Sequence, residues 1–237
     1  MPPLRSSGQL ALTLEHADRF GREDFLEGPS NAAALALVER WPDWPDHIVV
    51  LVGPEGSGKS HLAAIWAATA GAKVVAAPAL IETELPGLAT DALVLEDLAE
   101  GRFDERMLFH LLNLARQNGS FALLTARTSP AGWPITIKDL ASRLRALPVI
   151  SLAPPEDALL RAVIVKLFAD RQISVDESLV SYLAARIERT FAGARAAVVT
   201  LDREALRQQR PVTRALAVDL FRDQLELFGQ DNDTESL

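Results

Sequence analysis

The residues with the clearest chemical signature form a glycine-rich stretch between an apolar run and a helical pattern. This stretch reads Gly53-Pro54-Glu55-Gly56-Ser57-Gly58-Lys59-Ser60 and fits the pattern G-x-x-x-x-G-K-[ST]. Glycines let backbone N–H groups turn toward phosphate oxygens, and the following helix N-terminus adds positive potential. We expect Lys59 to reach the β- and γ-phosphates and Ser60 to offer its hydroxyl to Mg²⁺. The stretch, with His61 directly after it, predicts a site for ADP or ATP.

Two carboxylates and a threonine follow later apolar runs. Glu96 and Asp97 end the run that begins at Leu93, and Thr125 ends the run Phe121–Thr125. We expect one carboxylate, with Glu96 as the candidate, to hold Mg²⁺ through water and the other to orient or activate a hydrolytic water. Thr125 could touch the γ-phosphate, although threonine is also a common strand residue. A surface turn could equally carry the acidic pair, but its place after a phosphate loop favours the catalytic interpretation.

Three arginines are further cations of interest. Arg143 and Arg145 precede the last apolar run, and Arg195 lies near the start of a later helical pattern. The alternative for each is that the side chain is solvated on the surface, where most arginines lie.

These residues need a scaffold that brings distant strand ends together. Short, continuous apolar runs alternate with helical patterns such as Lys59–Ala70 and Asp104–Gln117, and this alternation predicts a parallel α/β sheet with both faces covered. The runs are His47–Val52, Lys73–Ala77, Asp91–Glu96, Ser120–Ala126 and Pro148–Leu152.

After Pro154-Pro155 the pattern becomes purely helical. Apolar residues recur at three- and four-residue steps, which predicts a small α-helical second domain, here called the lid. The four predicted helices are Glu156–Arg171, Asp176–Glu188, Gly193–Gln208 and Val212–Phe228. The expected organisation is a flexible segment at 1–19, an α/β domain at 20–153, the lid at 154–228 and an acidic tail at 229–237.

Composition excludes several classes of protein. The 237 residues are 49 % hydrophobic and 24 % charged, which excludes a wholly disordered chain. The absence of cysteine excludes a disulfide scaffold, a zinc finger and a thiol nucleophile. A net charge of −8 argues against a domain that wraps DNA. Because no run has the length of a signal peptide core or a membrane span, we expect a cytoplasmic protein with no membrane contact.

Several of these segments resemble the ATPase domain of the bacterial replication initiator DnaA. The resemblance rests on Phe25-Leu26-Glu27-Gly28-Pro29-Ser30-Asn31 before an Ala-rich helix, on Leu108-Phe109-His110-Leu111-Leu112-Asn113, and on Asp139-Leu140-Ala141-Ser142-Arg143-Leu144. It runs from about residue 20 to residue 206. It implies an AAA+ P-loop NTPase, with a five-stranded parallel sheet flanked by helices and followed by the lid.

The ends of the chain narrow the resemblance. The chain stops soon after the lid, where DnaA continues into a DNA-reading helix-turn-helix domain. Near the N-terminus, Gln9, Leu10, Leu12 and Leu14 look like a peptide that docks in the apolar groove of the replicative sliding clamp, with a first strand of the core as the alternative. Together these features resemble the Hda-type regulatory inactivators of DnaA.

That resemblance implies a role as a negative regulator of replication initiation. Docked on the DNA-loaded sliding clamp, such a protein stimulates hydrolysis of the ATP bound to DnaA. Arg143 then matches an arginine finger that acts in trans, and Arg195 matches the sensor II arginine that touches the protein's own nucleotide. The implied partners are DnaA, the clamp (the beta subunit of DNA polymerase III) and a possible second copy of the chain, without sequence-specific DNA binding.

Two residues depart from the initiator's pattern. Glu96 stands where the initiator has the first of two aspartates, and Arg127 replaces an aspartate after the sensor strand. Both changes favour a protein that holds nucleotide, with weak or no ATPase activity of its own.

Two alternatives remain at this stage. One is an ATPase of the helicase-loader or transposition-helper type that grips single-stranded DNA, against which the net charge counts. The other is a small-molecule kinase, against which the lid and the arginine before the last strand count.

Overall fold

The computed structural model describes residues 20–221 and contains a parallel five-stranded sheet with the order β2-β3-β4-β1-β5. The strands are β1 (Ile48–Val52), β2 (Lys73–Ala76), β3 (Ala92–Leu98), β4 (Phe121–Ala126) and β5 (Val149–Ser151). All four pairs of neighbouring strands run parallel. The predicted fold class, a parallel sheet with flanking helices and a helical region after it, is confirmed.

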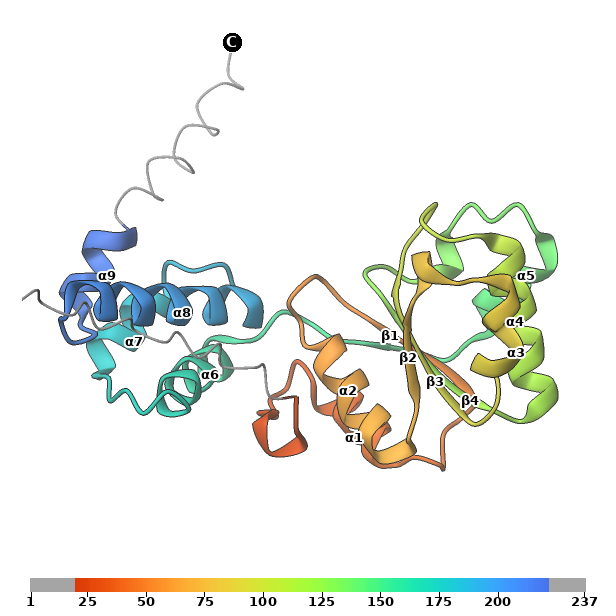
Figure 1. Cartoon of the computed structure of the whole chain (residues 1–237), viewed down its shortest axis with the longest axis horizontal. Coiled ribbons are helices and arrows are strands. Elements are labelled where there is room, and N and C mark those ends of the chain that lie inside the picture. The colour runs from red at the N-terminus through yellow and green to blue at the C-terminus, as the bar shows by residue number, and fades with distance from the viewer. Residues whose placement is uncertain (1–19, 222–237) are drawn as a thin grey trace, which may run out of the picture.

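Helices cover both faces of this sheet (Figure 1). One layer holds α1 (Ala32–Glu39) and α2 (Lys59–Ala70), and the other holds α3 (Leu85–Leu88), α4 (Glu105–Asn118) and α5 (Lys138–Ala146). Successive side chains of a strand point to opposite faces. Accordingly, Val49 and Leu51 pack in the α1–α2 core, whereas Ile48, Val50 and Val52 pack in the core that contains residues of α3, α4 and α5. Each fully buried Val, Leu or Ile side chain contributes about 1.5–3 kcal/mol.

The prediction that every strand is covered on both faces is wrong for the sheet edges. In β2 the side chain of Val74 is 54 % exposed and only Val75 is half-buried, and Val149 of β5 is also exposed. Within residues 20–221, both strands have a hydrogen-bonded neighbour on one side only. A second correction concerns β3, which continues two residues beyond the predicted end at Glu96 and so includes Asp97 and Leu98.

The lid comprises α6 (Asp157–Ala169), α7 (Glu177–Ala184), α8 (Phe191–Gln208) and α9 (Arg214–Phe221), which pack around an apolar core of their own. In α8 the helix begins two residues before the predicted Gly193, because Thr190 is the N-cap and its hydroxyl accepts from the Gly193 N–H at 2.9 Å. The last predicted helix begins at Arg214 rather than Val212, and its end lies outside the described residues.

Short 3₁₀ helices complete the described chain. They are η1 (Arg22–Asp24), η2 (Ala77–Ala79), η3 (Glu82–Glu84) and η4 (Pro130–Gly132). Across residues 20–221, each helix is too short or too polar to span a lipid bilayer.

Candidate nucleotide-binding site

The glycine-rich stretch Gly53–Ser60, here called the phosphate loop, joins the buried strand β1 to the N-terminus of α2. Its backbone requires glycine at two positions, since φ is +70° at Gly56 and +97° at Gly58. At Gly56 a Cβ atom would also lie 2.7 Å from the Cβ of Thr190, so the lid packs directly on the loop. The loop therefore presents the helix N-terminus that the sequence predicted for phosphate binding.

Lys59 lies folded over this loop. Its ammonium group donates to the carbonyls of Gly53 and Pro54, both at 2.8 Å. Burial lowers the pKa of Lys59, and the guanidinium of Arg127 lowers it further, whereas the nearby carboxylate of Asp97 opposes the shift. A partly buried cation that donates to neutral carbonyls is well suited to exchange them for phosphate oxygens.

The predicted carboxylates and Thr125 meet at the carboxyl ends of the neighbouring strands β3 and β4. In the strand register Thr125 lies opposite Leu51 of β1, and its hydroxyl accepts from the Asp97 N–H at 3.2 Å. This contact stabilises a bulge in β3, where the register against β4 shifts between Leu95 and Leu98 and Asp97 has a φ of +56°. The Asp97 side chain is exposed at this bulge. Its carboxylate is close enough to the phosphate loop to raise the pKa of Lys59.

The donor set fits a nucleotide with Mg²⁺. The hydroxyl of Ser57 and the Oε1 atom of Glu96 are both buried without a hydrogen-bond partner among the described residues. Within residues 20–221 no cluster of three or more His, Asp or Glu side chains could hold a metal by itself. Magnesium typically takes one or two protein ligands and completes its shell with phosphate oxygens and water. Ser60 and Glu96 are the residues that would hold it.

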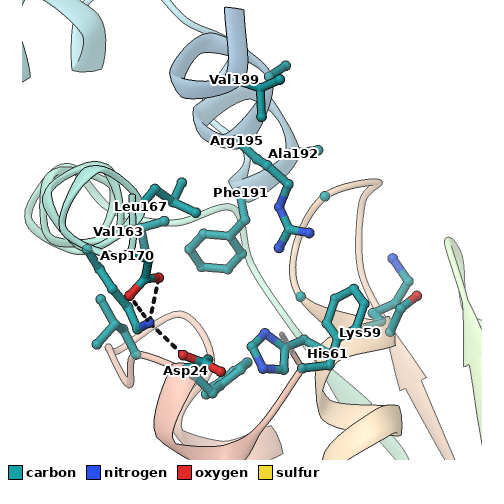
Figure 2. Close-up of a pocket in the computed structure, with 18 of the residues that line it drawn as sticks. Asp24, Lys59, His61, Val163, Leu167, Asp170, Phe191, Ala192, Arg195 and Val199 are labelled. Carbon is teal, nitrogen blue, oxygen red and sulfur yellow. Dashed lines mark hydrogen bonds and ion pairs between the residues drawn. The ribbon is translucent and has the colours of Figure 1, made fainter. Parts of the chain in front are cut away.

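A cavity of about 590 Å³ opens between the phosphate loop, the segment before α1 and the lid helices α6 and α8 (Figure 2). The predicted site residues in its lining are Gly56, Gly58, Lys59, Ser60, His61 and Arg195. Figure 2 shows Arg195 of α8 pointing into this cavity. The lining does not include Gly53, Pro54, Glu55, Ser57, Glu96, Asp97, Thr125 or Arg143. The structure thus places Arg195 of the lid opposite the start of α2.

His61 holds the segment before α1 against α2. Its ring makes edge contacts with Phe20 and Phe25, with centroids 5.2 and 5.1 Å apart, and its Nε2 atom lies 3.0 Å from the Gly21 carbonyl oxygen. Burial lowers the pKa of His61, so the ring is neutral at pH 7. His61 therefore shapes the cavity wall with an apolar surface.

Residues that sequence reasoning missed connect the lid to the rest of the cavity. Lys166 of α6 donates to Asp24 of η1 at 2.6 Å, a contact drawn in Figure 2, and the Phe191 N–H donates to the Gly56 carbonyl at 2.9 Å. The Lys166 and Asp24 side chains are only 23 % and 13 % exposed. An ion pair between residues so far apart in the chain leaves no local signal in the sequence.

Arg143 lies elsewhere, on α5. Its guanidinium carbon is 5.1 Å from the centroid of the Phe109 ring of α4. At the start of α5 the Glu105 carboxylate accepts from the backbone N–H groups of Thr136 and Ile137 at 3.0 and 2.9 Å. Helix α4 thus contacts the arginine and also fixes the beginning of its helix. The predicted clamp-binding residues Gln9, Leu10, Leu12 and Leu14 lie outside the described residues.

No protein-family model matches the chain, and a search of curated proteins gives no significant match. Solved structures do match. Domain III of the replication initiation protein DnaA from Thermotoga maritima superposes with a TM-score of 0.72 at 18 % identity, over 86 % of this chain and 96 % of that one.

Two further structures give the same fold. The RuvB Holliday junction branch migration motor of Thermotoga maritima matches with a TM-score of 0.68 at 18 % identity, over 86 % of this chain and 72 % of that one. AMPPCP-bound DnaA from Aquifex aeolicus matches with a TM-score of 0.63 at 16 % identity, over 76 % and 64 %. The chain therefore has the AAA+ P-loop NTPase fold, in the form that DnaA domain III and RuvB share.

Proposed function

We propose that this protein is a nucleotide-holding regulator that stimulates ATP hydrolysis by DnaA. In this proposal ADP or ATP, with Mg²⁺, occupies the cavity between the phosphate loop and the lid. The similar DnaA structure from Aquifex aeolicus binds the nucleotide analogue AMPPCP, which supports a nucleotide as the ligand. Lys59 and the loop N–H groups hold the phosphates, and Arg195 approaches them from the lid. Mg²⁺ held by Ser60 and Glu96 would neutralise part of the negative charge of the phosphates.

The observation that carries the regulatory part is the position of Arg143. This arginine lies outside the lining of the chain's own cavity, on a helix that α4 holds at its beginning and again at Phe109. An arginine fixed in this way is suited to enter another protein's nucleotide site. There it would stabilise the charge that develops on the γ-phosphate, an effect worth about 10³–10⁵ in rate for arginine fingers.

The docking part of the proposal rests on the sequence alone. Gln9, Leu10, Leu12 and Leu14 would hold the protein on the DNA-loaded sliding clamp, where it would contact ATP-bound DnaA. Replacement of Gln9 and Leu10 by alanine should abolish co-elution with the clamp and leave ADP affinity unchanged, because the peptide precedes the residues of the cavity. Retention of the clamp by this double variant would contradict the docking role.

The decisive experiment measures hydrolysis of DnaA-bound ATP in the presence of clamp, DNA and this protein. We expect the Arg143→Ala variant to lose stimulation by about 10³ while ADP affinity, measured by calorimetry, stays within about three-fold of the wild type. Arg145→Ala is the matched control, since its guanidinium donates to the Ala141 carbonyl within the same helix.

Three outcomes would contradict the proposal. Full stimulation by the Arg143→Ala variant would exclude the trans-acting role, and unchanged ADP binding by a Lys59→Ala variant would exclude the phosphate loop as the nucleotide site. Rapid ATP turnover by this protein alone, stimulated by single-stranded DNA, would favour the helicase-loader alternative.

A further inference from the structure

Arg127 directly follows the last residue of β4, at the end of the strand that lies beside the start of the phosphate loop. Its predecessor Ala126 lies opposite Val52 in the β1–β4 register, and the Ala126 carbonyl accepts from the Gly53 N–H at 3.2 Å. The backbone of Arg127 is thereby fixed next to the first residue of the loop. This position was expected only to remove a carboxylate from the site, but it also adds a cation there.

The guanidinium of Arg127 is paired with the loop itself. Its Nη2 atom lies 2.6 Å from Oε2 of Glu55, a residue of the phosphate loop. The two side chains are 64 % and 72 % exposed, so water competes for both charges and the pair contributes little to stability. A pair of this strength is readily exchanged for a more highly charged partner.

The potential around Arg127 reaches the centre of the loop. Its charge is the largest cause, after burial, that lowers the pKa of Lys59, and the charges of Glu55 and Asp97 oppose it. Arg127 therefore increases the attraction of the loop for anions. Its planar guanidinium can donate two parallel hydrogen bonds to phosphate oxygens, a geometry that lysine does not provide.

We propose that Arg127 binds the terminal phosphate of a nucleoside triphosphate in the chain's own site, and that Glu55 holds the guanidinium when this phosphate is absent. The proposal rests on the nucleotide site of the preceding section and adds to it a means of distinguishing ATP from ADP. With ADP, Arg127 keeps its ion pair with Glu55. With ATP, the guanidinium leaves the single carboxylate for the γ-phosphate oxygens.

Calorimetry with ADP and with AMPPCP, both in the presence of Mg²⁺, tests this assignment. Arg127→Gln should weaken AMPPCP binding about ten-fold, because a charged hydrogen bond is lost, and ADP binding by less than about two-fold. Arg127→Lys should recover part of the AMPPCP affinity. The matched control is Arg116→Gln. Arg116 pairs with Asp46, which precedes β1 and so lies at the end of that strand away from the phosphate loop.

The Glu55→Gln variant tests the competing carboxylate. It should raise AMPPCP affinity about three-fold, since Arg127 no longer has to leave an ion pair. In the Arg127→Gln background the same substitution should give a clearly smaller gain. An equal gain in both backgrounds would show that Glu55 acts only by repelling the phosphates and would overturn its holding role.

The outcomes separate this inference from the function on which it rests. An AMPPCP-to-ADP affinity ratio that Arg127→Gln leaves unchanged, while both nucleotides still bind, overturns the role of Arg127 alone. Equal loss of both nucleotides overturns it as well, because Arg127 would then support the loop rather than read the γ-phosphate. A wild-type protein that binds neither nucleotide overturns the proposed function and this inference together.

Discussion

At the residue scale, His61 follows the phosphate loop directly but forms part of the cavity wall rather than a phosphate contact. The sequence placed it among the nucleotide-binding residues because it follows Ser60 directly. In the structure its ring lies between two phenylalanines and reaches the Gly21 carbonyl, and burial lowers its pKa from the ordinary value of 6.5. Burial disfavours the protonated ring more than the Gly21 carbonyl and the Asp24 carboxylate favour it.

This environment predicts a pH dependence of stability. The folded state binds the His61 proton less tightly than the unfolded state does, so the unfolded state gains protons as the pH falls through 6.5. The contribution of His61 is therefore complete above pH 6.5 and decreases below it. The melting temperature of the wild type should fall between pH 7.5 and pH 5.5 by more than that of His61→Gln, measured by thermal denaturation. Parallel pH profiles for the two proteins would contradict the assignment.

At the element scale, α4 and α5 form a unit that positions Arg143. The Glu105 carboxylate caps the two backbone N–H groups before α5, and these hydrogen bonds are the main cause that lowers its pKa. Leu140 and Leu144 anchor α5 in the core shared with α4. The direction of the Arg143 side chain thus depends on contacts made by another helix.

Removal of the cap should loosen the beginning of α5 without unfolding the sheet. In a Glu105→Ala variant we expect the Thr136 and Ile137 amides to exchange with deuterium several-fold faster, since both lose their acceptor. Stimulation of DnaA should fall several-fold with ADP affinity unchanged. Glu100→Ala, at an exposed acidic residue, is the control. Unchanged amide exchange would show that the Glu105 contacts do not hold α5, whatever the outcome of the DnaA assay.

At the scale of the whole molecule, the lid is attached to the rest of the chain on two sides of the cavity. Phe191 contacts the phosphate loop, and Lys166 binds Asp24 of the segment before α1. The apolar core of the lid is separate from the two cores of the sheet, so local contacts such as these join the two parts. Half-buried ion pairs of this kind are more costly to break than exposed ones, because one charge remains desolvated.

Loss of the Lys166–Asp24 pair should shorten the residence of a bound nucleotide. We expect Lys166→Met to raise the dissociation rate of a fluorescent ADP analogue about three- to ten-fold in stopped-flow measurements, since the lid opens more easily. Lys138→Met, at an exposed position at the start of α5, should leave this rate unchanged. A dissociation rate in Lys166→Met equal to that of the wild type would show that the pair does not govern opening.

The sequence by itself determined the features that depend on neighbours along the chain. The phosphate loop and the acidic pair Glu96-Asp97 are contiguous residues, and alternation of apolar runs with helical patterns is sufficient to predict the parallel sheet, which the structure confirms. The hydrophobic pattern alone does not determine where helices begin. Helix α8 begins earlier than its pattern indicates, because the Thr190 cap acts through one hydrogen bond rather than through periodicity.

Only the tertiary structure decided which distant charges meet. Lys166 and Asp24 are 142 residues apart, and Glu105 is 31 and 32 residues from the two N–H groups that it accepts from. The pairing of Arg127 with Glu55 likewise depends on β4 lying beside β1, an order that alternation alone does not specify. Hydrophobic periodicity indicates which face of an element is buried. It does not indicate which polar side chain of a neighbouring element will lie within bonding distance. That information arises only when packing has fixed the strand order and the closure of the lid.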